Sequence, residues 1–270
     1  MRANFKPGPI FDAHFHVIDP RYPLTENQGF RPDAFPVDRY RAAVDALDVR
    51  GGAVVSGSFQ GFDHSYIGPA LAALHAGGGQ WVGVVQAPAH ISDEQILELH
   101  AVGVRGVRFN LMRGLTMPPS ELVALARRVH VVAGWHSAVY ADAASLAPLA
   151  DALSALPALV IDHLGMNEAG LPVVLDLVRA GARVKATGFG RVALDIPGAL
   201  QRIAACNPAA LLFGTDLPST RARRAFHPTD QDLLYQVLGD DLARKITWDN
   251  PRAFYGLDTA PNTPRASTAA

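Results

Sequence analysis

The sequence has little cysteine, few lysines and no long apolar run. Its one cysteine, Cys206, excludes an internal disulfide framework and a cysteine-based zinc site. Cys206 stands in IAACNP at the end of an expected helix, where we expect a buried structural thiol. No apolar stretch reaches the ~18 residues of a membrane span, and the N-terminal MRANFKPGPI lacks the apolar region of a signal peptide. These absences predict a cytoplasmic protein.

Charge of either sign is also sparse. Charged residues make up 18% of the chain, and the formal net charge is −1. No excess of one sign draws the whole molecule to nucleic acid or to an anionic membrane, so neither is an expected partner. By contrast, 49% of the 270 residues are apolar, which is enough for the large core of a compact enzyme. The composition leaves the oligomeric state open.

Short β-rich runs alternate with longer amphipathic segments along the chain. The expected strands are Ile10–Val17, Ala53–Ser56, Trp81–Gln86, Gly106–Asn110, Trp135–Tyr140, Ala158–His163, Arg183–Gly188 and Leu211–Asp216. The expected helices are Asp38–Val49, Ser65–Ala76, Ser92–Ala101, Ser120–Ala133, Asp142–Ala155, Glu168–Ala180, Asp195–Cys206 and Gln231–Leu238. Eight strand–helix repeats predict an α/β fold, a (β/α)8 TIM barrel. An open doubly wound sheet would favour a glycine-rich loop after the first strand, which instead ends in HFHVIDP.

Two segments depart from the repeat. Asp19–Pro36 follows the first strand and is long and proline-rich, and such loops in compact domains are usually functional or disordered. We expect it to fold over the C-terminal end of the barrel, where the first strand delivers it. The polar segment 258–270 predicts a disordered tail, which leaves one barrel domain over residues 1–257.

Polar side chains stand at the ends of three expected strands. His14 and His16 alternate along the first strand, so they share one face, and Asp12 is expected in the same phase. His163 and Asp216 close the sixth and eighth strands. Catalytic groups of such barrels gather at the C-terminal ends of the strands, so we expect these side chains to converge. Taken singly, His163 also suits a hydrogen-bonded core position, and Asp216 suits a turn cap.

These segments resemble the amidohydrolase superfamily of barrel hydrolases. The resemblance rests on FDAHFHV, VIDHLG and FGTDLPS around His14, His16, His163 and Asp216, and further on GVRFNL, GWHSAVY, VKATGFGR and NPRAFYGL, over residues 8–257. It is strongest to the branch of 2-pyrone-4,6-dicarboxylate lactonase and sugar lactonases. The sequence departs from that branch where TDLPS replaces the common SDWPH, so that Leu217 stands for Trp and Ser219 for His.

The resemblance implies hydrolysis of a lactone or carboxylic ester. Asp216 would be the general base that takes a proton from water. His14, His16 and His163, with Asp216, would either bind one divalent metal ion, zinc or manganese, or polarise the carbonyl directly without a metal.

A pair of metal ions is not expected. Binuclear relatives use a carboxylated lysine on strand 4, where this chain has Arg108 and Asn110, and a histidine on strand 5. His136 begins the fifth strand, so we expect it at the floor of the barrel.

Arginines indicate the substrate class. The resemblance and the inward phase of the strands make Arg108, Arg113, Tyr140 and Arg191 candidate substrate-binding residues. Because a guanidinium pairs bidentately with a carboxylate, they predict a small anionic organic substrate. His64 and His227 lie in loops, with surface positions expected. Two other functions remain open: a metal-dependent decarboxylase of the same superfamily, and a non-catalytic binding barrel.

Overall fold

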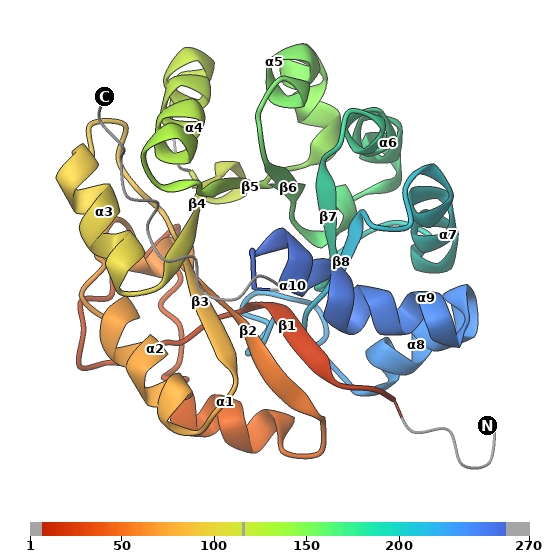
Figure 1. The fold of residues 1–270 in the computed structure, drawn as a ribbon, viewed down its shortest axis with the longest axis horizontal. Coiled ribbons are helices and arrows are strands. Elements are labelled where there is room, and N and C mark those ends of the chain that lie inside the picture. Colours follow the sequence, from red (N-terminus) through yellow and green to blue (C-terminus); the bar gives the residue numbers. More distant parts are fainter. Residues whose placement is uncertain (1–6, 115–116, 258–270) are drawn as a thin grey trace, which may run out of the picture.

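The computed structural model describes residues 7–114 and 117–257 and has eight parallel strands around a common centre (Figure 1). The strands are hydrogen-bonded in chain order: β1 Ile10–Phe15, β2 Val49–Val55, β3 Gln80–Val85, β4 Val104–Asn110, β5 His136–Tyr140, β6 Leu159–Ile161, β7 Arg183–Ala186 and β8 Leu211–Phe213. Helices surround this sheet on its outer face (Figure 1). The expected TIM barrel is confirmed.

One or more helices follow each strand. The α-helices are α1 Val37–Val44, α2 Ile67–Ala76, α3 Asp93–Ala101, α4 Pro119–Ala133, α5 Ala150–Ser154, α6 Leu171–Arg179, α7 Ile196–Cys206, α8 Thr229–Leu238, α9 Asp240–Arg244 and α10 Asn250–Phe254. Of these, α10 lies at the centre of the ring (Figure 1), where Phe254 packs against the inner core. Ser92 caps α3 as expected, since its hydroxyl accepts the backbone N–H of Gln95. No helix of the described residues is long and apolar enough to cross a bilayer.

Several expected boundaries are wrong. The helix expected over Asp38–Val49 ends at Val44, and β2 begins at Val49, four residues before the expected strand. The helix expected over Asp142–Ala155 is a 3-10 helix up to Leu149, because Pro148 lacks the N–H that an α-helix needs there. The sequence pattern also missed α9 and α10, which follow the last barrel helix.

The core has two layers, one on each face of the sheet. Apolar side chains, most of them small, fill the barrel interior: Phe11, Ala13, Ala53, Val55, Val82, Val84, Ala138, Val160, Leu212 and Tyr255. A larger layer joins the outer face of the strands to the helices. Cys206 is partly exposed at the end of α7 and packs against the outer layer, so the expectation of a fully buried thiol is wrong.

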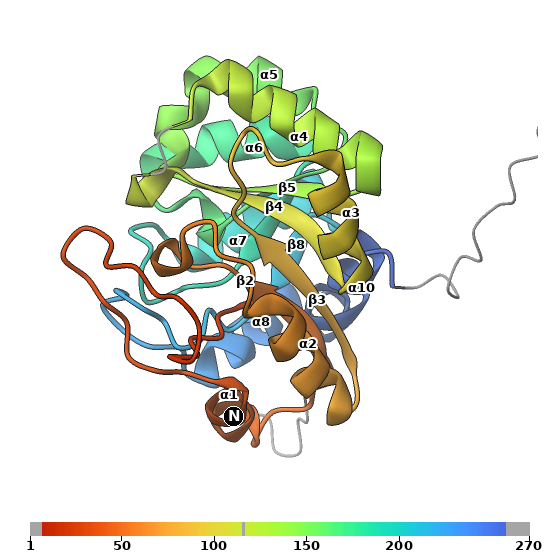
Figure 2. The ribbon, with the colours of Figure 1, turned by 90° about the vertical axis from the view of Figure 1, so that its left-hand side faces the viewer.

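The segment 19–36 lies over the C-terminal end of the barrel, as expected (Figure 2). Its backbone pairs with β1's continuation through Ile18 and Phe35. The side chain of Asn27 donates to the carbonyl of Arg113, and the guanidinium of Arg221 binds the carbonyl of Asn27. These contacts tie the segment to the loops after β4 and β8. The expected tail, residues 258–270, lies outside the described residues.

Candidate active site

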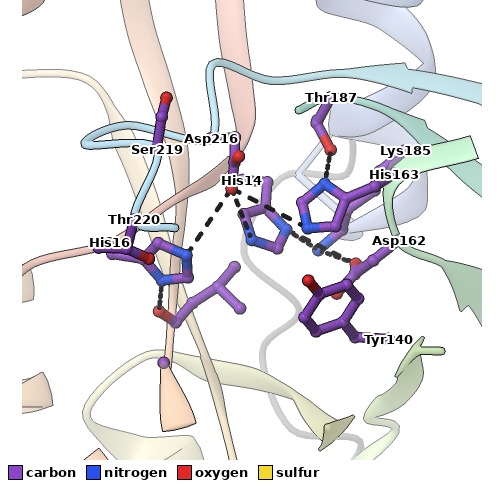
Figure 3. Close-up of polar contacts among 12 residues, drawn as sticks. His14, His16, Tyr140, Asp162, His163, Lys185, Thr187, Asp216, Ser219 and Thr220 are labelled. Carbon is purple, nitrogen blue, oxygen red and sulfur yellow. Dashed lines mark hydrogen bonds and ion pairs between the residues drawn. The ribbon is translucent and has the colours of Figure 1, made fainter. Parts of the chain in front are cut away.

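Three imidazoles surround one carboxylate at the C-terminal ends of the strands (Figure 3). The Nε2 atoms of His14 and His16 both lie 3.8 Å from Oδ1 of Asp216, and Nε2 of His163 lies 3.9 Å from it. All four residues are at most 4% exposed. The structure therefore brings the four expected side chains into one small volume.

An irregularity in β1 accompanies the turn of His14 into this volume, and His16 follows just beyond the end of the strand. The register with β2 shifts between Asp12 and Phe15, which changes the alternation of side chains there. Ala13 packs in the inner core, Phe15 packs in the outer core, and His14 beside Ala13 still faces the site.

Asp12 does not share the phase of the histidines, contrary to expectation. Its Oδ2 accepts hydrogen bonds from the hydroxyls of Tyr40 and Thr215, at 2.9 and 2.6 Å, and its Oδ1 accepts from the backbone N–H of Thr215. Tyr40 belongs to α1 and stacks on Phe15 in the outer core. Asp12 is therefore a structural residue at the junction of β1 and β8.

His163 and Asp216 follow strands that end earlier than expected. β6 stops at Ile161 and β8 at Phe213, and the two site residues have φ values of 53° and 60°. A left-handed backbone at residues other than glycine is strained and is common at active sites. Here it turns each side chain toward the barrel axis just beyond the strand end.

The centre of the cluster has unused hydrogen-bonding capacity. Oδ1 of Asp216 and Nε2 of His14 are both buried and make no hydrogen bond among the described residues. Buried polar atoms normally have partners, so this pair indicates a place for a small polar group such as a water molecule or a carbonyl oxygen.

Each imidazole is oriented by a different partner at Nδ1. His16 lies 2.7 Å from the carbonyl of Val55, which only accepts, so Nδ1 carries the hydrogen and Nε2 presents its lone pair to the centre. His163 lies 2.7 Å from the hydroxyl of Thr187. His14 faces Nζ of Lys185 at 3.2 Å.

Sequence reasoning missed Asp162 and Lys185, whose side chains both contact His14 (Figure 3). Oδ2 of Asp162 accepts from Nε of Arg108 at 2.9 Å, and its Oδ1 lies 3.2 Å from Nζ of Lys185. Both residues are 0% exposed. The alternation of side chains along the strands could have predicted both positions. Asp162 is two residues after Val160, which faces the barrel interior, and the neighbours of Lys185 in the chain face outward, so Lys185 faces inward.

Burial determines the charge of these groups. Desolvation is the main cause that lowers the pKa of His14 and His163 well below the usual value and lowers that of His16 to about 3, so all three are neutral. Burial alone would raise the pKa of Asp162, but the charges of Lys185 and Arg108 hold it well below its usual range. Burial raises the pKa of Asp216, although the charge of Arg191 opposes this shift. The raised pKa makes Asp216 a stronger base.

Arg191 is bound to Asp216 by two hydrogen bonds. Its Nε and Nη2 donate to Oδ2 of Asp216 at 2.8 and 2.5 Å, which leaves Oδ1 directed at the imidazoles. Its Nη1 reaches the hydroxyl of Tyr140 at 3.4 Å, and the guanidinium of Arg108 lies 4.8 Å from the centre of the Tyr140 ring. The two inner arginines thus already have carboxylate partners.

Two arginines farther from the cluster, Arg113 and Arg221, have no carboxylate partner among the described residues. In the described part of the chain, neither Arg113 nor Arg221 forms an ion pair, and both are partly exposed. The two charges are near enough to repel, since Arg113 contributes, after burial, to the lowered pKa of Arg221. Arg221 also stacks on Phe30 of the segment 19–36, at 4.4 Å.

A cavity over the cluster combines these groups. Its polar lining comes from His16, Arg108, Asn110, Arg113, Tyr140, His163, Arg191 and Arg221. Phe30 and Phe59 add apolar walls. All four expected substrate-binding residues line this cavity. Arg221 also lines it and was not predicted from the sequence.

Comparison with known proteins identifies the family. The amidohydrolase family profile matches residues 11–257, which is nearly the whole described chain. The chain belongs to the amidohydrolase family.

Two curated relatives match this amidohydrolase over most of its length. A 2-pyrone-4,6-dicarboxylate hydrolase of Comamonas testosteroni is 29% identical and covers 94% of this chain and 92% of its own length. A 4-sulfomuconolactone hydrolase of Hydrogenophaga intermedia is 28% identical and covers 95% and 91%. A solved structure of a protein from Pseudomonas putida superposes with a TM-score of 0.78 at 25% identity over 93% of this chain and 98% of its own.

Many amidohydrolases hold a metal ion, and the spacing here suits one. His14, His16 and Asp216 place one ligand atom each within 4.8 Å of one another, and nitrogen and carboxylate donors suit zinc. The surroundings of His14 fit less well. Metal-ligating histidines usually donate the N–H of their other ring nitrogen to an acceptor, whereas Nδ1 of His14 faces an ammonium.

The remaining histidines lie outside this site. His136 is buried at the start of β5, where its ring packs on Phe254 and Tyr255, so its expected place at the barrel floor is confirmed. His64 contacts the carbonyl of Gln86, and His227 is exposed beside Thr229. Ser219, at a position of departure from the family pattern, accepts the backbone N–H of Phe226.

Proposed function

We propose that this amidohydrolase opens the ring of a small lactone that carries an anionic group. The observation that carries the proposal is the pair of unsatisfied buried atoms, Oδ1 of Asp216 and Nε2 of His14, beneath a cavity lined by four arginines. The hydrolases of Comamonas testosteroni and Hydrogenophaga intermedia, whose names refer to a dicarboxylate and a sulfonated lactone, support the same substrate class.

In the proposed reaction, water attacks the lactone carbonyl as Asp216 takes its proton. The elevated pKa of Asp216 favours this proton transfer, and its hydrogen bonds to Arg191 keep Oδ1 aimed at the water. A neutral imidazole N–H stabilises the carbonyl oxygen as negative charge develops on it. Collapse of the tetrahedral intermediate breaks the ring C–O bond, and Asp216 returns the proton to the departing oxygen. The product is a ring-opened hydroxy acid.

The arginines divide into two sets in this proposal. Arg108 and Arg191 are balanced by Asp162 and Asp216, so they and Tyr140 hold the reacting end of the substrate. Arg113 and Arg221 lack such partners among the described residues, and we assign the substrate's anionic group mainly to them. The cavity should therefore prefer anions over neutral ligands.

The first prediction tests this function with a panel of anionic and neutral lactones and esters, with and without a chelator. Asp216→Asn should abolish the chemical step and leave product affinity within about threefold of wild type, because it removes the base but not the arginines.

Arg113→Met and Arg221→Met should each raise KM about tenfold, because each variant loses one charge-assisted hydrogen bond to the substrate. Exposed Arg223→Met is the matched control and should leave KM unchanged.

The products separate the alternatives. Release of carbon dioxide in place of ring opening would support a decarboxylase, and binding without turnover of any member would support a non-catalytic barrel. Equal turnover of neutral and anionic lactones by wild type and both arginine variants would contradict the anionic specificity.

A further inference from the structure

Lys185 lies inside the barrel, next to His14. It comes from β7 and is 0% exposed, and its Nζ lies 3.2 Å from Nδ1 of His14 and 3.2 Å from Oδ1 of Asp162 (Figure 3). The proposed reaction leaves this residue without a role, since it does not line the cavity. A buried lysine between a carboxylate and an imidazole nonetheless constrains both of them.

The contact restricts the position of the hydrogen on His14. An ammonium has three N–H donors and no acceptor, so a ring nitrogen that faces it is favoured when it presents a lone pair. Among the described residues, the other group that faces Nδ1 is Oδ1 of Asp162, which is farther away, at 3.5 Å, and forms an ion pair with the ammonium at 3.2 Å but no hydrogen bond. A hydrogen on Nδ1 would point at the N–H groups of Lys185.

We infer that Lys185 is a positioning residue that holds neutral His14 in the tautomer with its hydrogen on Nε2. The backbone carbonyl of Val55 holds His16 in the opposite tautomer, with the hydrogen on Nδ1. The two neighbouring imidazoles therefore present different groups to the centre: His14 an N–H donor, and His16 a lone pair.

The tautomer changes what His14 does. A metal ion binds the lone pair of a ring nitrogen, so Nε2–H of His14 opposes its use as a ligand. The same N–H is a donor aimed at the space beside Asp216, where it stabilises a carbonyl oxygen; this role in catalysis rests on the proposed function. The tautomer itself does not depend on that function.

The test is ring-nitrogen NMR of the full chain with ¹⁵N-labelled histidine at neutral pH. His14→Gln assigns the His14 signals by their loss. Wild type should show a protonated Nε2 and an unprotonated Nδ1 at His14, and the reverse pattern at His16. A protonated Nδ1 at His14 in wild type would overturn the inference without any variant of Lys185.

Lys185→Met tests the cause. It keeps the length of the side chain and removes the donor, so Nδ1–H of His14 can donate to Asp162, and the lone pair at Nε2 becomes free. The His14 signals should switch to the other tautomer, and zinc affinity by equilibrium dialysis should rise at least about tenfold over wild type. Exposed Lys245→Met is the matched control and should change neither.

Unchanged His14 signals and unchanged zinc affinity in folded Lys185→Met would refute the role of Lys185. Neither measurement uses turnover, so failure of the lactone panel leaves this test intact. Conversely, an active lactonase whose wild-type His14 carries its hydrogen on Nδ1 would disprove only the positioning role.

Discussion

Three buried carboxylates of the barrel differ because their neighbours differ. Burial raises the pKa of Asp12 to about 6, although the N–H and O–H groups that bind it oppose this shift. Asp162 is held ionised by Lys185 and Arg108, and Asp216 is made more basic by burial that one arginine only partly offsets. Residue type alone would assign all three the same chemistry. All three are fully buried, so it is their partners that divide them into a residue at the junction of β1 and β8, an ion-pair residue and the proposed base.

A prediction at this scale concerns His136 at the barrel floor. Burial is the main cause that lowers its pKa to about 3, so it is neutral in the folded protein, whereas the unfolded chain protonates it below its ordinary 6.5. The unfolded state then binds more protons, and stability falls as pH drops from 6.5 toward 3.

His136→Gln should remove this contribution. Between pH 6 and pH 4, the unfolding free energy of wild type should fall more steeply than that of the variant, by about 1.4 kcal/mol per pH unit for one proton. Urea unfolding at several pH values measures both slopes. Parallel slopes would show that His136 does not stay neutral in the folded protein.

The segment 19–36 is the element that differs most from a plain barrel connection. The backbones of Asn27 and Phe30 pair with each other, and the backbone N–H of Thr25 donates to the carbonyl of Phe59 at 2.7 Å. Phe30 and Arg221 place it over the cavity. The segment therefore belongs to the wall of the cavity rather than to the supporting barrel.

Asn27→Ala tests this connection. It removes the hydrogen bond that the side-chain amide of Asn27 donates to the carbonyl of Arg113, worth about 1 kcal/mol, so KM should rise about fivefold while kcat changes little. Hydrogen exchange within 19–36 should become faster. Asn250→Ala removes the hydrogen bonds that its side-chain amide donates to the carbonyls of Pro208 and Leu211, and as the control it should lower stability without changing KM. An unchanged exchange rate in Asn27→Ala would separate the segment from the pocket.

At the scale of the whole molecule, closure of the barrel and assembly of the site use the same bonds. β1 and β8 meet where the backbone N–H of Asp216 donates to the carbonyl of His14 at 2.7 Å, and that of His16 donates to Leu217 at 2.8 Å. The Asp12 carboxylate then binds Thr215 between them. Opening this seam would separate Asp216 from both strand-1 histidines.

Thr215→Val should therefore weaken stability and catalysis together. It removes the hydroxyl that donates to Asp12 at 2.6 Å, a bond to a charged group worth about 1.5–3 kcal/mol. The unfolding free energy should fall by that amount, and kcat should fall with it because Asp216 is the next residue. Exposed Thr229→Val is the control. Lower stability with unchanged kcat would show that the seam and the site are independent.

The sequence by itself determined the barrel, the family resemblance and the convergence of His14, His16, His163 and Asp216. Local pattern carries this information, because strand–helix alternation sets the topology and parallel strands of a barrel end at one face. The same reasoning placed the inward phase of Arg108 correctly. It failed at Asp12, because a shift of register in β1 is invisible in an alternating pattern.

Only the tertiary structure decided which charges are paired. Arg108 with Asp162, Arg191 with Asp216, and Lys185 with His14 are 54, 25 and 171 residues apart in the chain. The pairing depends on distances of a few ångströms between side chains of different strands. Burial of these side chains increases the effect of each charged partner on their pKa values. Sequence spacing contains neither quantity, so the roles of these residues come from the folded barrel.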